Sequence, residues 1–332
     1  MKAMQLKNFG FIEEEPLELV DISTPDPEKG EILIRVNICG VCHTDLHTVE
    51  GELPEVKLPV IPGHQIVGTV EKLGEGAARF IKGDRVGVAW LYSTCGKCRY
   101  CRNDKENLCE NARFTGYSAD GGYAEYMVIP EKFAYRIPEI FSDEEASPLL
   151  CAGIIGYRAL RLSQIKPGQR LGLYGFGASA HVAIQVAVHW GCEVYVFSRS
   201  KDHCAHAEKL GAVWTGTSKE KPPEKLDSSI NFTPAGDTVL DGLRHLDKGG
   251  IHTLAGIYMS PVPEMDYTEY LYHERTLRSV ANATRRDGEE LLKIAGEIPI
   301  RTTTQAFPLE DANKVLKLVK NSKIDGAAIL KL

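Results

Sequence analysis

The chain has 332 residues, of which 43% are hydrophobic and 25% are charged, and its formal net charge is -6. This composition is typical of a globular protein and favours two domains over one, and the scattered basic residues argue against a nucleic-acid partner. The first residues hold no apolar run typical of a signal peptide, and no later segment is long and apolar enough to span a membrane. We therefore expect a cytoplasmic protein with no membrane partner.

Short β-type runs broken by glycine and proline dominate the chain from about residue 31. They lie at 31–38, 66–76, 84–90 and 123–129. This pattern predicts an antiparallel, partly barrel-like β domain.

Apolar strands begin to alternate with helical segments near residue 155. The predicted strands lie at 170–175, 192–198, 228–232 and 251–257, and the predicted helices at 176–191, 201–212 and 238–250. The alternation predicts an α/β, doubly wound parallel sheet of the Rossmann type over 155–290. A helix at 308–323 and a strand at 326–332 are expected to return to the first domain, which then comprises 1–154 and 291–332.

Four of the nine cysteines lie close together in a lobe at about 90–113. Cys95, Cys98, Cys101 and Cys109 have the spacing C-x2-C-x2-C-x7-C. Zinc binds four thiolates tetrahedrally in closed structural sites, so a structural zinc ion is predicted. An iron–sulfur cluster and unligated thiols are the alternatives, but the fourth cysteine of a ferredoxin motif usually precedes a proline, whereas Glu110 follows Cys109.

A glycine-rich turn follows the first strand of the predicted parallel sheet. Gly175, Gly177 and Ala180 fit the pattern G-x-G-x-x-A, in which the glycines allow a tight turn and close approach to a pyrophosphate. Glycines also end strands for purely structural reasons, but between a strand and a helix of a parallel sheet the motif predicts a dinucleotide site.

The end of the second strand of this sheet lacks the acidic residue that usually binds the adenosine ribose of NAD. Ser198, Arg199, Ser200 and Lys201 stand there instead. Hydroxyls and cations can hold a 2′-phosphate, so NADP is favoured over NAD. The alternative is a solvated turn in an enzyme that binds NAD loosely.

Six motifs extend over nearly the whole chain: GVCHTDLH (40–47), PGHQIVGTV (62–70), CGKCRYCRNDKENLC (95–109), GYSADGGYAEY (116–126), LLCAGIIGYRAL (149–160) and YGFGASA (174–180). Together they resemble the motifs of the zinc-dependent alcohol dehydrogenases of the medium-chain dehydrogenase/reductase superfamily, with the bacterial propanol-preferring and yeast-like members the most similar. The resemblance implies a GroES-like β-rich catalytic domain, a Rossmann coenzyme domain and two zinc ions per chain.

The resemblance also implies the ligands of the catalytic zinc. Matched motif to motif, they are Cys42, His64 and Cys151, with the fourth position open for water or substrate. Cys39, three residues before Cys42, is interpreted as a packing residue, and so are Cys192 and Cys204.

Further roles follow from the same resemblance. Thr44 and His47 would relay the proton if their segment is helical, and His43 would contact the cofactor pyrophosphate. Asp45 would orient a zinc-ligand histidine, with His64 as the expected partner. Trp90 and Leu91 correspond to positions that line the substrate pocket, although ordinary core packing is nearly as good an interpretation.

Three positions depart from the family pattern. Gln65 stands where glutamate usually follows the histidine ligand, so the zinc should be more electropositive toward substrate. Ile155 replaces a threonine that often packs behind the nicotinamide. Ala327 follows Gly326 where an arginine often contacts the pyrophosphate, which predicts a weaker grip on the cofactor.

These features together predict an enzyme that interconverts small alcohols with aldehydes or ketones, and that forms a homotetramer or homodimer by resemblance. One alternative is a polyol or amino-alcohol dehydrogenase of the same superfamily. The other is a zinc- and NADP-binding protein without catalysis.

Overall fold

A computed structural model of the chain describes residues 1–54, 56–298 and 300–332. The chain divides into two compact units. The first comprises Met1–Cys151, Thr284–Gly296 and Arg301–Leu332, and the second comprises Ala152–Ala283 and Glu297–Ile300. In the part of the chain that the structure describes, no helix is long and apolar enough to cross a membrane.

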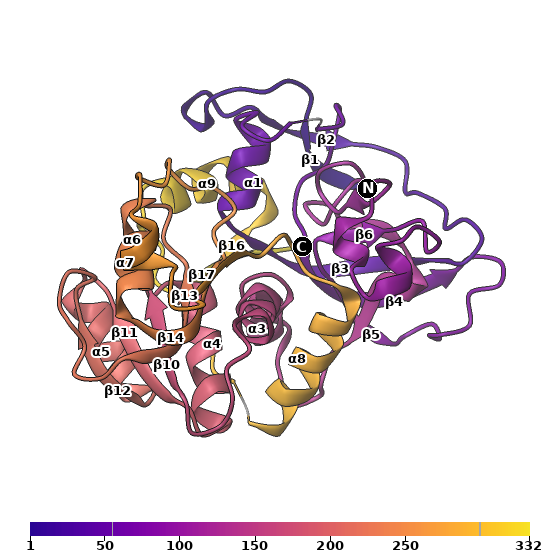
Figure 1. Cartoon of the computed structure of the whole chain (residues 1–332). Helices are drawn as coiled ribbons and strands as arrows, with labels where there is room; N and C mark the ends of the chain where they lie inside the picture. Colours follow the sequence, from indigo (N-terminus) through magenta and orange to yellow (C-terminus); the bar gives the residue numbers. More distant parts are fainter. Residues whose placement is uncertain (55, 299) are drawn as a thin grey trace. The chain divides into compact units, whose positions relative to one another are not determined.

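The first unit is built mainly of β-strands (Figure 1). Its strands are β1 (Lys2–Leu6), β2 (Leu17–Asp21), β3 (Glu31–Val41), β4 (Gln65–Leu73), β5 (Arg85–Val88), β6 (Leu91–Ser93), β7 (Arg113–Phe114), β8 (Tyr126–Pro130), β9 (Ala134–Arg136), β16 (Thr304–Pro308) and β17 (Ala327–Lys331). Its helices are α1 (His43–Val49), α2 (Asp143–Ala146), α8 (Arg285–Glu297), whose last residue falls in the second unit, and α9 (Ala312–Lys320).

A seven-stranded sheet forms the centre of the first unit. Its order is β16-β17-β3-β4-β5-β9, with β8 paired to β3, and all of its pairings except β16 with β17 are antiparallel. Strands β1 and β2 form one separate two-stranded sheet, and β6 and β7 form another. The strands at 31–38 and 123–129 that the sequence predicts correspond to β3 and β8, which pair with each other.

The register of β3 and β4 fixes the position of the chemical groups at their ends. Gly40 pairs with Gln65 across these strands, so the residues just after β3 and just before β4 meet at one end of the sheet. Gly40 also has no room for a side chain, because a Cβ there would lie 2.8 Å from the Ser147 Oγ and 2.9 Å from the Gln65 Cβ. The strand pairing therefore brings Cys42 beside His64.

The second unit is an α/β sandwich with a six-stranded parallel sheet. Its strands are β10 (Arg170–Tyr174), β11 (Glu193–Phe197), β12 (Ala212–Gly216), β13 (Leu226–Asn231), β14 (Leu246–Leu254) and β15 (Thr276–Ser279), in the order β12-β11-β10-β13-β14-β15. Its helices are α3 (Ala152–Ser163), α4 (Ala178–His189), α5 (Lys201–Lys209), α6 (Asp237–His245) and α7 (Tyr267–Tyr270). This is the strand order of dinucleotide-binding folds, whose ligands bind where the order reverses, here beside β10 and β13.

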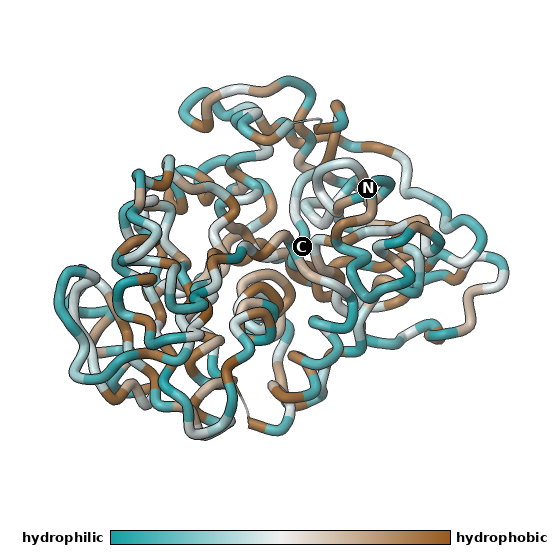
Figure 2. The backbone as a smooth tube through the Cα atoms, viewed as in Figure 1, coloured by the Kyte–Doolittle hydropathy of each residue, from teal (hydrophilic) through white to brown (hydrophobic). Residues whose placement is uncertain are grey.

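Hydropathy follows this layering within the second unit. Figure 2 shows helix α3, seen end-on, mostly in brown, and the loops around α5 mostly in teal. Helix α3 packs on α4, β13 and β14, and most of its residues are buried. An apolar-rich helix of this kind belongs in a core layer rather than on the surface.

The helix predicted at 238–250 is wrong in its second half. Helix α6 ends at His245, where Leu246 turns to φ -64° and ψ 146°, and residues from Leu246 on belong to β14. Leu246 continues the apolar spacing of the preceding helix, but its pairing with Leu226 of β13 places it in a strand instead. Strand β12, helix α3 and strand β15 were not predicted from the sequence.

Candidate active site

Two thiols and one imidazole converge at the end of the first unit's central sheet. The Cys42 Sγ lies 3.6 Å from the His64 Nε2, and the Cys151 Sγ lies 3.4 Å from the same nitrogen. All three donor atoms lie within 4.8 Å of one another. A tetrahedral zinc ion with bonds of about 2.3 Å to sulfur and about 2.0 Å to nitrogen separates such donors by about 3.5 Å. The three side chains thus fit a zinc ion with one position left for a further ligand.

Local sequence explains how Cys42 is held. It is the N-cap of helix α1, and its Sγ accepts a hydrogen bond from the Thr44 backbone N–H at 3.4 Å. Asp45 completes a capping box, because its Oδ2 accepts from the Cys42 backbone N–H at 2.9 Å. The sequence C-H-T-D therefore fixes the first ligand through the start of its own helix.

Cys151 reaches the same point from a different segment. It directly follows a short 3-10 helix, Ser147–Leu150, and the Ser147 Oγ donates to the Gln65 carbonyl oxygen at 2.8 Å. Ser147 and Gln65 are both buried. This bond ties the segment before Cys151 to the first residue of β4, directly after His64, and it could not be predicted from either motif alone.

Asp45 also contacts the imidazole of His64. The His64 Nδ1 lies 3.0 Å from the Asp45 Oδ1, and both side chains are almost completely buried. A carboxylate accepts hydrogen bonds, so the Nδ1 carries the proton and the Nε2 faces the two thiols as the ligand atom. The contact is the one that the sequence analysis assigns to Asp45.

The charges in this cluster are strongly coupled. Burial lowers the pKa of His64, but the charges and hydrogen bonds of Asp45 and Cys42 outweigh it and raise the pKa to about 10, so a metal ion at the Nε2 would displace a proton from that nitrogen. The pKa of Cys42 is raised well above its ordinary value by its hydrogen bond to Cys151, by burial and by the charge of Cys151. Two thiols side by side resist becoming thiolates unless a cation compensates them, which is the chemistry of a metal site.

The four cysteines of the lobe form a second group of donors. The sulfurs of Cys95, Cys98, Cys101 and Cys109 all lie within 4.8 Å of one another. The Sγ of Cys98 lies 3.5 Å from that of Cys101, which lies 4.0 Å from that of Cys95, close to the separation of about 3.8 Å in a tetrahedral four-sulfur zinc site.

Backbone N–H groups also point at these sulfurs. The Cys98 N–H donates to the Cys95 Sγ at 3.3 Å, and hydrogen bonds from the backbone of Lys97 and Cys98 lower the pKa of Cys95 to about 6. Burial raises the pKa of Cys109 to about 11. The backbone of the lobe therefore favours the thiolate form of Cys95, and all four positions around an ion would be filled by protein.

Aromatic rings form a wall next to His64. The ring of Trp90 meets that of His64 edge-on at 4.8 Å between centroids, and it stacks on Phe114 at 5.4 Å. Tyr117 lies 5.6 Å from Trp90. Leu91, the first residue of β6, is buried. Phe114 and Tyr117 were missed from the sequence, where the position of Tyr117 in the motif GYSADGGYAEY was the available signal.

Helix α1 carries the three residues assigned to cofactor contact and proton transfer. Residues His43–Val49 are helical, which is the condition on which the prediction for Thr44 and His47 depends. The His47 Nδ1 contacts the Glu52 carboxylate. Because a carboxylate only accepts, the His47 Nε2 is the nitrogen left to take up a proton. Glu52 was not singled out from the sequence.

The glycine-rich turn of the second unit links β10 to α4. Gly175 has φ +81°, a conformation that glycine adopts without strain, and a Cβ there would lie 2.9 Å from the Thr233 side chain. Gly177 is the N-cap of α4, and a Cβ on it would meet no atom within 4 Å. Ala180 is fully buried in the first turn of α4. The turn has the form that brings a pyrophosphate to a helix N-terminus.

Ser198, Arg199 and Lys201 lie at the carboxyl end of β11 and the start of α5. The Ser200 backbone N–H donates to the Ser198 Oγ at 3.2 Å, and the Ser200 side chain caps α5. Within the described residues, no carboxylate pairs with Arg199 or Lys201 at salt-bridge distance. The end of this strand therefore presents two cations and a helix N-terminus.

Comparison with known proteins adds to these observations. A family model described as "Alcohol dehydrogenase GroES-like domain" matches residues 28–139, and one described as "Zinc-binding dehydrogenase" matches residues 180–297. A probable alcohol dehydrogenase of Mycobacterium tuberculosis is 46% identical over 335 residues, covering 99% of this chain and 97% of that protein.

Two solved structures resemble the chain over its full length. The cobalt- and zinc-bound thermostable alcohol dehydrogenase from Pyrobaculum aerophilum has a TM-score of 0.89 at 28% identity, covering 100% of this chain and 99% of that one. The CAD protein from Helicobacter pylori, complexed with NADP(H), has a TM-score of 0.87 at 25% identity, with coverage of 100% and 99%.

Proposed function

Since the chain belongs to the zinc-dependent alcohol dehydrogenases of the medium-chain dehydrogenase/reductase superfamily, we propose that Cys42, His64 and Cys151 hold the zinc ion at which its reaction occurs. Members of this family are oxidoreductases that interconvert alcohols with aldehydes using zinc and a nicotinamide cofactor, and this chain has that activity. The observation that carries the proposal is the convergence of three buried or half-buried donors with tetrahedral spacing.

The residues around this site would divide the work of the reaction. The bound zinc supplies a Lewis acid that lowers the pKa of an alcohol hydroxyl or polarises a carbonyl. Asp45 keeps the proton on the His64 Nδ1, so that the Nε2 stays available as a ligand. Trp90, with Phe114 and Tyr117, excludes water and favours a substrate with an apolar body beside its hydroxyl.

Proton transfer is assigned to Thr44 and His47. Both lie on α1 three positions apart, and the contact of Glu52 with the His47 Nδ1 leaves the Nε2 to accept the proton lost by the alcohol. His43, exposed at the first position of α1, is assigned to the cofactor pyrophosphate. These three roles rest on the family resemblance together with the position of the helix.

A second zinc ion in the cysteine lobe is part of the same proposal. Cys95, Cys98, Cys101 and Cys109 would fill all four positions, so this ion would stabilise the lobe and take no part in the reaction. The chain would then hold two zinc ions, one per group of donors.

NADP is the proposed cofactor. The support is the pair of cations Arg199 and Lys201 with Ser198 at the end of β11, where an acidic residue would repel a 2′-phosphate. The Helicobacter pylori neighbour, which is complexed with NADP(H), is consistent with this preference. Ala327, in place of an arginine, would weaken the grip on the cofactor without changing the preference.

A homodimer or homotetramer is the proposed assembly. Strand β15 ends the order of the parallel sheet, and four large apolar or aromatic side chains in the segment before it are between 59% and 66% exposed in the described part of the chain: Ile257, Tyr258, Tyr267 and Tyr272. Exposed aromatic side chains beside a sheet edge are typical of a protein interface.

A cytoplasmic location stays a prediction of the sequence. The domain boundaries at 154 and 290 also stay predictions; the second compact unit of the structure begins at Ala152, and the chain returns to the first unit at Thr284.

The proposed substrate class can be tested by absorbance at 340 nm with NAD and NADP in parallel, over a series of primary and secondary alcohols, sorbitol and threonine. We expect reduction of NADP with small apolar alcohols and little with sorbitol or threonine. The variant Cys151→Ser should lose this activity, whereas Cys192→Ser, which alters a buried cysteine far from the ligand set in sequence, should keep it. Activity with sorbitol above that with simple alcohols would contradict the proposed substrate class.

A further inference from the structure

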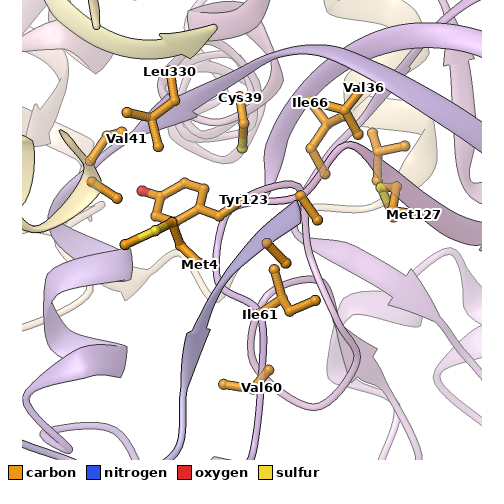
Figure 3. Close-up of a cluster of buried hydrophobic side chains, with 14 of the residues drawn as sticks. Met4, Val36, Cys39, Val41, Val60, Ile61, Ile66, Tyr123, Met127 and Leu330 are labelled. Carbon is orange, nitrogen blue, oxygen red and sulfur yellow. The ribbon is translucent and has the colours of Figure 1, made fainter. Parts of the chain in front are cut away.

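The cysteine lobe, residues 95–109, has few links to the rest of its unit. Of the residues between Cys95 and Cys109, all of which the structure describes, Glu106 and Asn107 alone are buried. The apolar cluster of the first unit, part of which Figure 3 shows, takes no described side chain from residues 93–111. A segment with few buried apolar contacts opens easily unless polar groups hold it. The lobe therefore depends on the polar side chains that it buries.

Glu106 joins the lobe to helix α8. It begins a short 3-10 helix, Glu106–Leu108, and its carboxylate meets Arg285, the first residue of α8. The Arg285 Nε donates to the Glu106 Oε1 at 2.9 Å and the Nη2 donates to the Oε2 at 2.6 Å. The Arg285 backbone N–H also donates to the Oε1, at 2.9 Å. Bidentate bonds between charged groups are stronger and more specific than single neutral ones.

Arg285 in turn rests on the apolar core. Its guanidinium lies over the ring of Phe133, 4.5 Å from the ring centroid. Phe133 is buried and belongs to the apolar cluster of the first unit. A planar guanidinium that stacks on a ring keeps its orientation toward a carboxylate. The link therefore runs from the lobe through Glu106 and Arg285 to the core.

Helix α8 presents Arg285 from a fixed start. The Thr284 backbone N–H donates to the Asp287 Oδ2 at 2.8 Å, and the Asp287 backbone N–H donates to the Thr284 Oγ1 at 3.3 Å. Both of these residues are buried. The first N–H groups of a helix have no partner within it, and Glu106 accepts from that of Arg285 with a negative charge that a helix N-terminus favours.

Glu106 also bears on the position of the last cysteine of the lobe. The Cys109 backbone N–H donates to the Glu106 carbonyl oxygen at 3.0 Å, and Cys109 directly follows the 3-10 helix that Glu106 begins. A ligand that is held in place before the metal binds reduces the ordering cost of binding. The anchored segment thus keeps the Cys109 Sγ among the other three sulfurs.

We propose that Glu106 is a positioning residue for the zinc ion of the cysteine lobe, and that its contact with Arg285 slows the loss of this ion by keeping Cys109 in place. This role rests on the proposed zinc ion held by the four cysteines. It gives a function to a buried carboxylate that is not itself one of the proposed ligands.

The test follows the release of zinc from the purified enzyme to a chromophoric chelator, in the wild type, Glu106→Gln and Arg285→Gln. Each variant should release one of its two zinc ions about 10-fold faster than the wild type, the size expected when hydrogen bonds between charged groups are lost. Hydrogen exchange of the backbone amides of residues 95–109 should become faster in parallel. When Glu106→Gln is combined with Cys98→Ser, which removes a ligand of the lobe, the faster phase should be absent.

Three further variants separate this role from a general effect on α8. Arg286→Gln removes the neighbouring ion pair of the same helix, in which the Arg286 Nε lies 2.6 Å from the Glu290 Oε1, and should leave zinc release unchanged. Arg285→Lys keeps the positive charge but loses the planar fork, so its rate should be intermediate. Glu106→Gln combined with Arg285→Gln should release zinc no faster than the faster single variant, because both changes remove the same contact.

The outcomes are distinct. A wild-type release rate in Glu106→Gln, even with lower stability to urea, overturns the proposed role and leaves the zinc ion of the lobe intact, because the pair is then an ordinary structural contact. Equal acceleration in Arg286→Gln also overturns it, since the stability of α8 would then set the rate. If Cys98→Ser has the zinc content of the wild type, the proposed ion and the role of Glu106 both fail.

Discussion

The substitution Asp45→Asn tests how one side chain holds both the first ligand and its helix. The Asp45 Oδ2 accepts from the Cys42 backbone N–H at 2.9 Å and the Oδ1 lies 3.0 Å from the His64 Nδ1. Both neighbours are donors. An asparagine offers one acceptor oxygen and one NH2 group, so it cannot serve both of them.

Either orientation of the asparagine amide damages the site, and the free-energy cost of each can be estimated from the contact that it loses. If the amide NH2 faces His64, the imidazole must present its Nδ1 as an acceptor, and the proton moves to the Nε2 that binds zinc. If it faces Cys42, the capping box of α1 is broken at a cost of about 1 kcal/mol. Loss of a carboxylate that orients a ligand histidine weakens metal binding by about 10- to 100-fold, or about 1.4 to 2.7 kcal/mol.

This affinity is measured by competition for zinc between the enzyme and a chromophoric chelator, whose absorbance reports the loss of the catalytic zinc. The matched control is Glu145→Gln, because the Glu145 Oε2 accepts from the Ser142 backbone N–H at 2.9 Å in the capping box of α2, which has no metal ligand. The control should lower stability slightly and leave zinc binding unchanged. Wild-type zinc affinity in Asp45→Asn would refute the reasoning.

Three further predictions concern single side chains. His47→Gln should lower kcat by about 100-fold, with partial recovery on addition of free imidazole, because the Nε2 is assigned to take up the proton; a kcat within twofold of the wild type would remove His47 from the relay. Gln65→Glu adds a negative charge beside His64 and should raise the apparent pKa of the kcat profile, whereas an unchanged profile would show that the position is electrostatically irrelevant. Acid should destabilise the second unit, because burial lowers the pKa of His252 to about 3 and that of His245 to about 4. The unfolded chain takes up these protons first, so stability is fully present above about pH 6.5 and is lost as the pH falls toward 4, by about 3 kcal/mol for His252. The free energy of unfolding, measured with urea between pH 4 and 7.5, should fall less steeply with decreasing pH in His252→Asn than in the wild type. An equal pH dependence in the two proteins would contradict the assignment.

The ligand set illustrates what the sequence could predict. Cys42, His64 and Cys151 were implied as ligands by the family resemblance of the motifs that contain them, and their donor atoms converge in the structure. The parallel sheet was predicted from the alternation of apolar strands with helices, since each strand needs a covering helix. The motifs are short and can be matched one by one, and the sheet is encoded in a regular period.

The features that were missed depend on contacts between distant segments. Phe114 stacks on Trp90, and Ser147 donates a hydrogen bond to Gln65. The partners in each pair lie far apart in the sequence, so no local sequence pattern predicts the contact. The second half of the helix predicted at 238–250 is a strand because Leu246 pairs with Leu226, a preference set by the sheet and not by the residues of LDKGG themselves. Tertiary context decided these points.

The metal content of purified protein tests the central claim most directly. Elemental analysis of the wild type and of Cys42→Ser and Cys98→Ser, combined with alcohol-dependent reduction of NADP, separates the two groups of donors. We expect two zinc ions per chain in the wild type, one for each group. Cys42→Ser should lose one ion and all activity while the fold persists, whereas Cys98→Ser should lose the other ion, with lower stability. Full zinc content with full activity in Cys42→Ser would contradict the account.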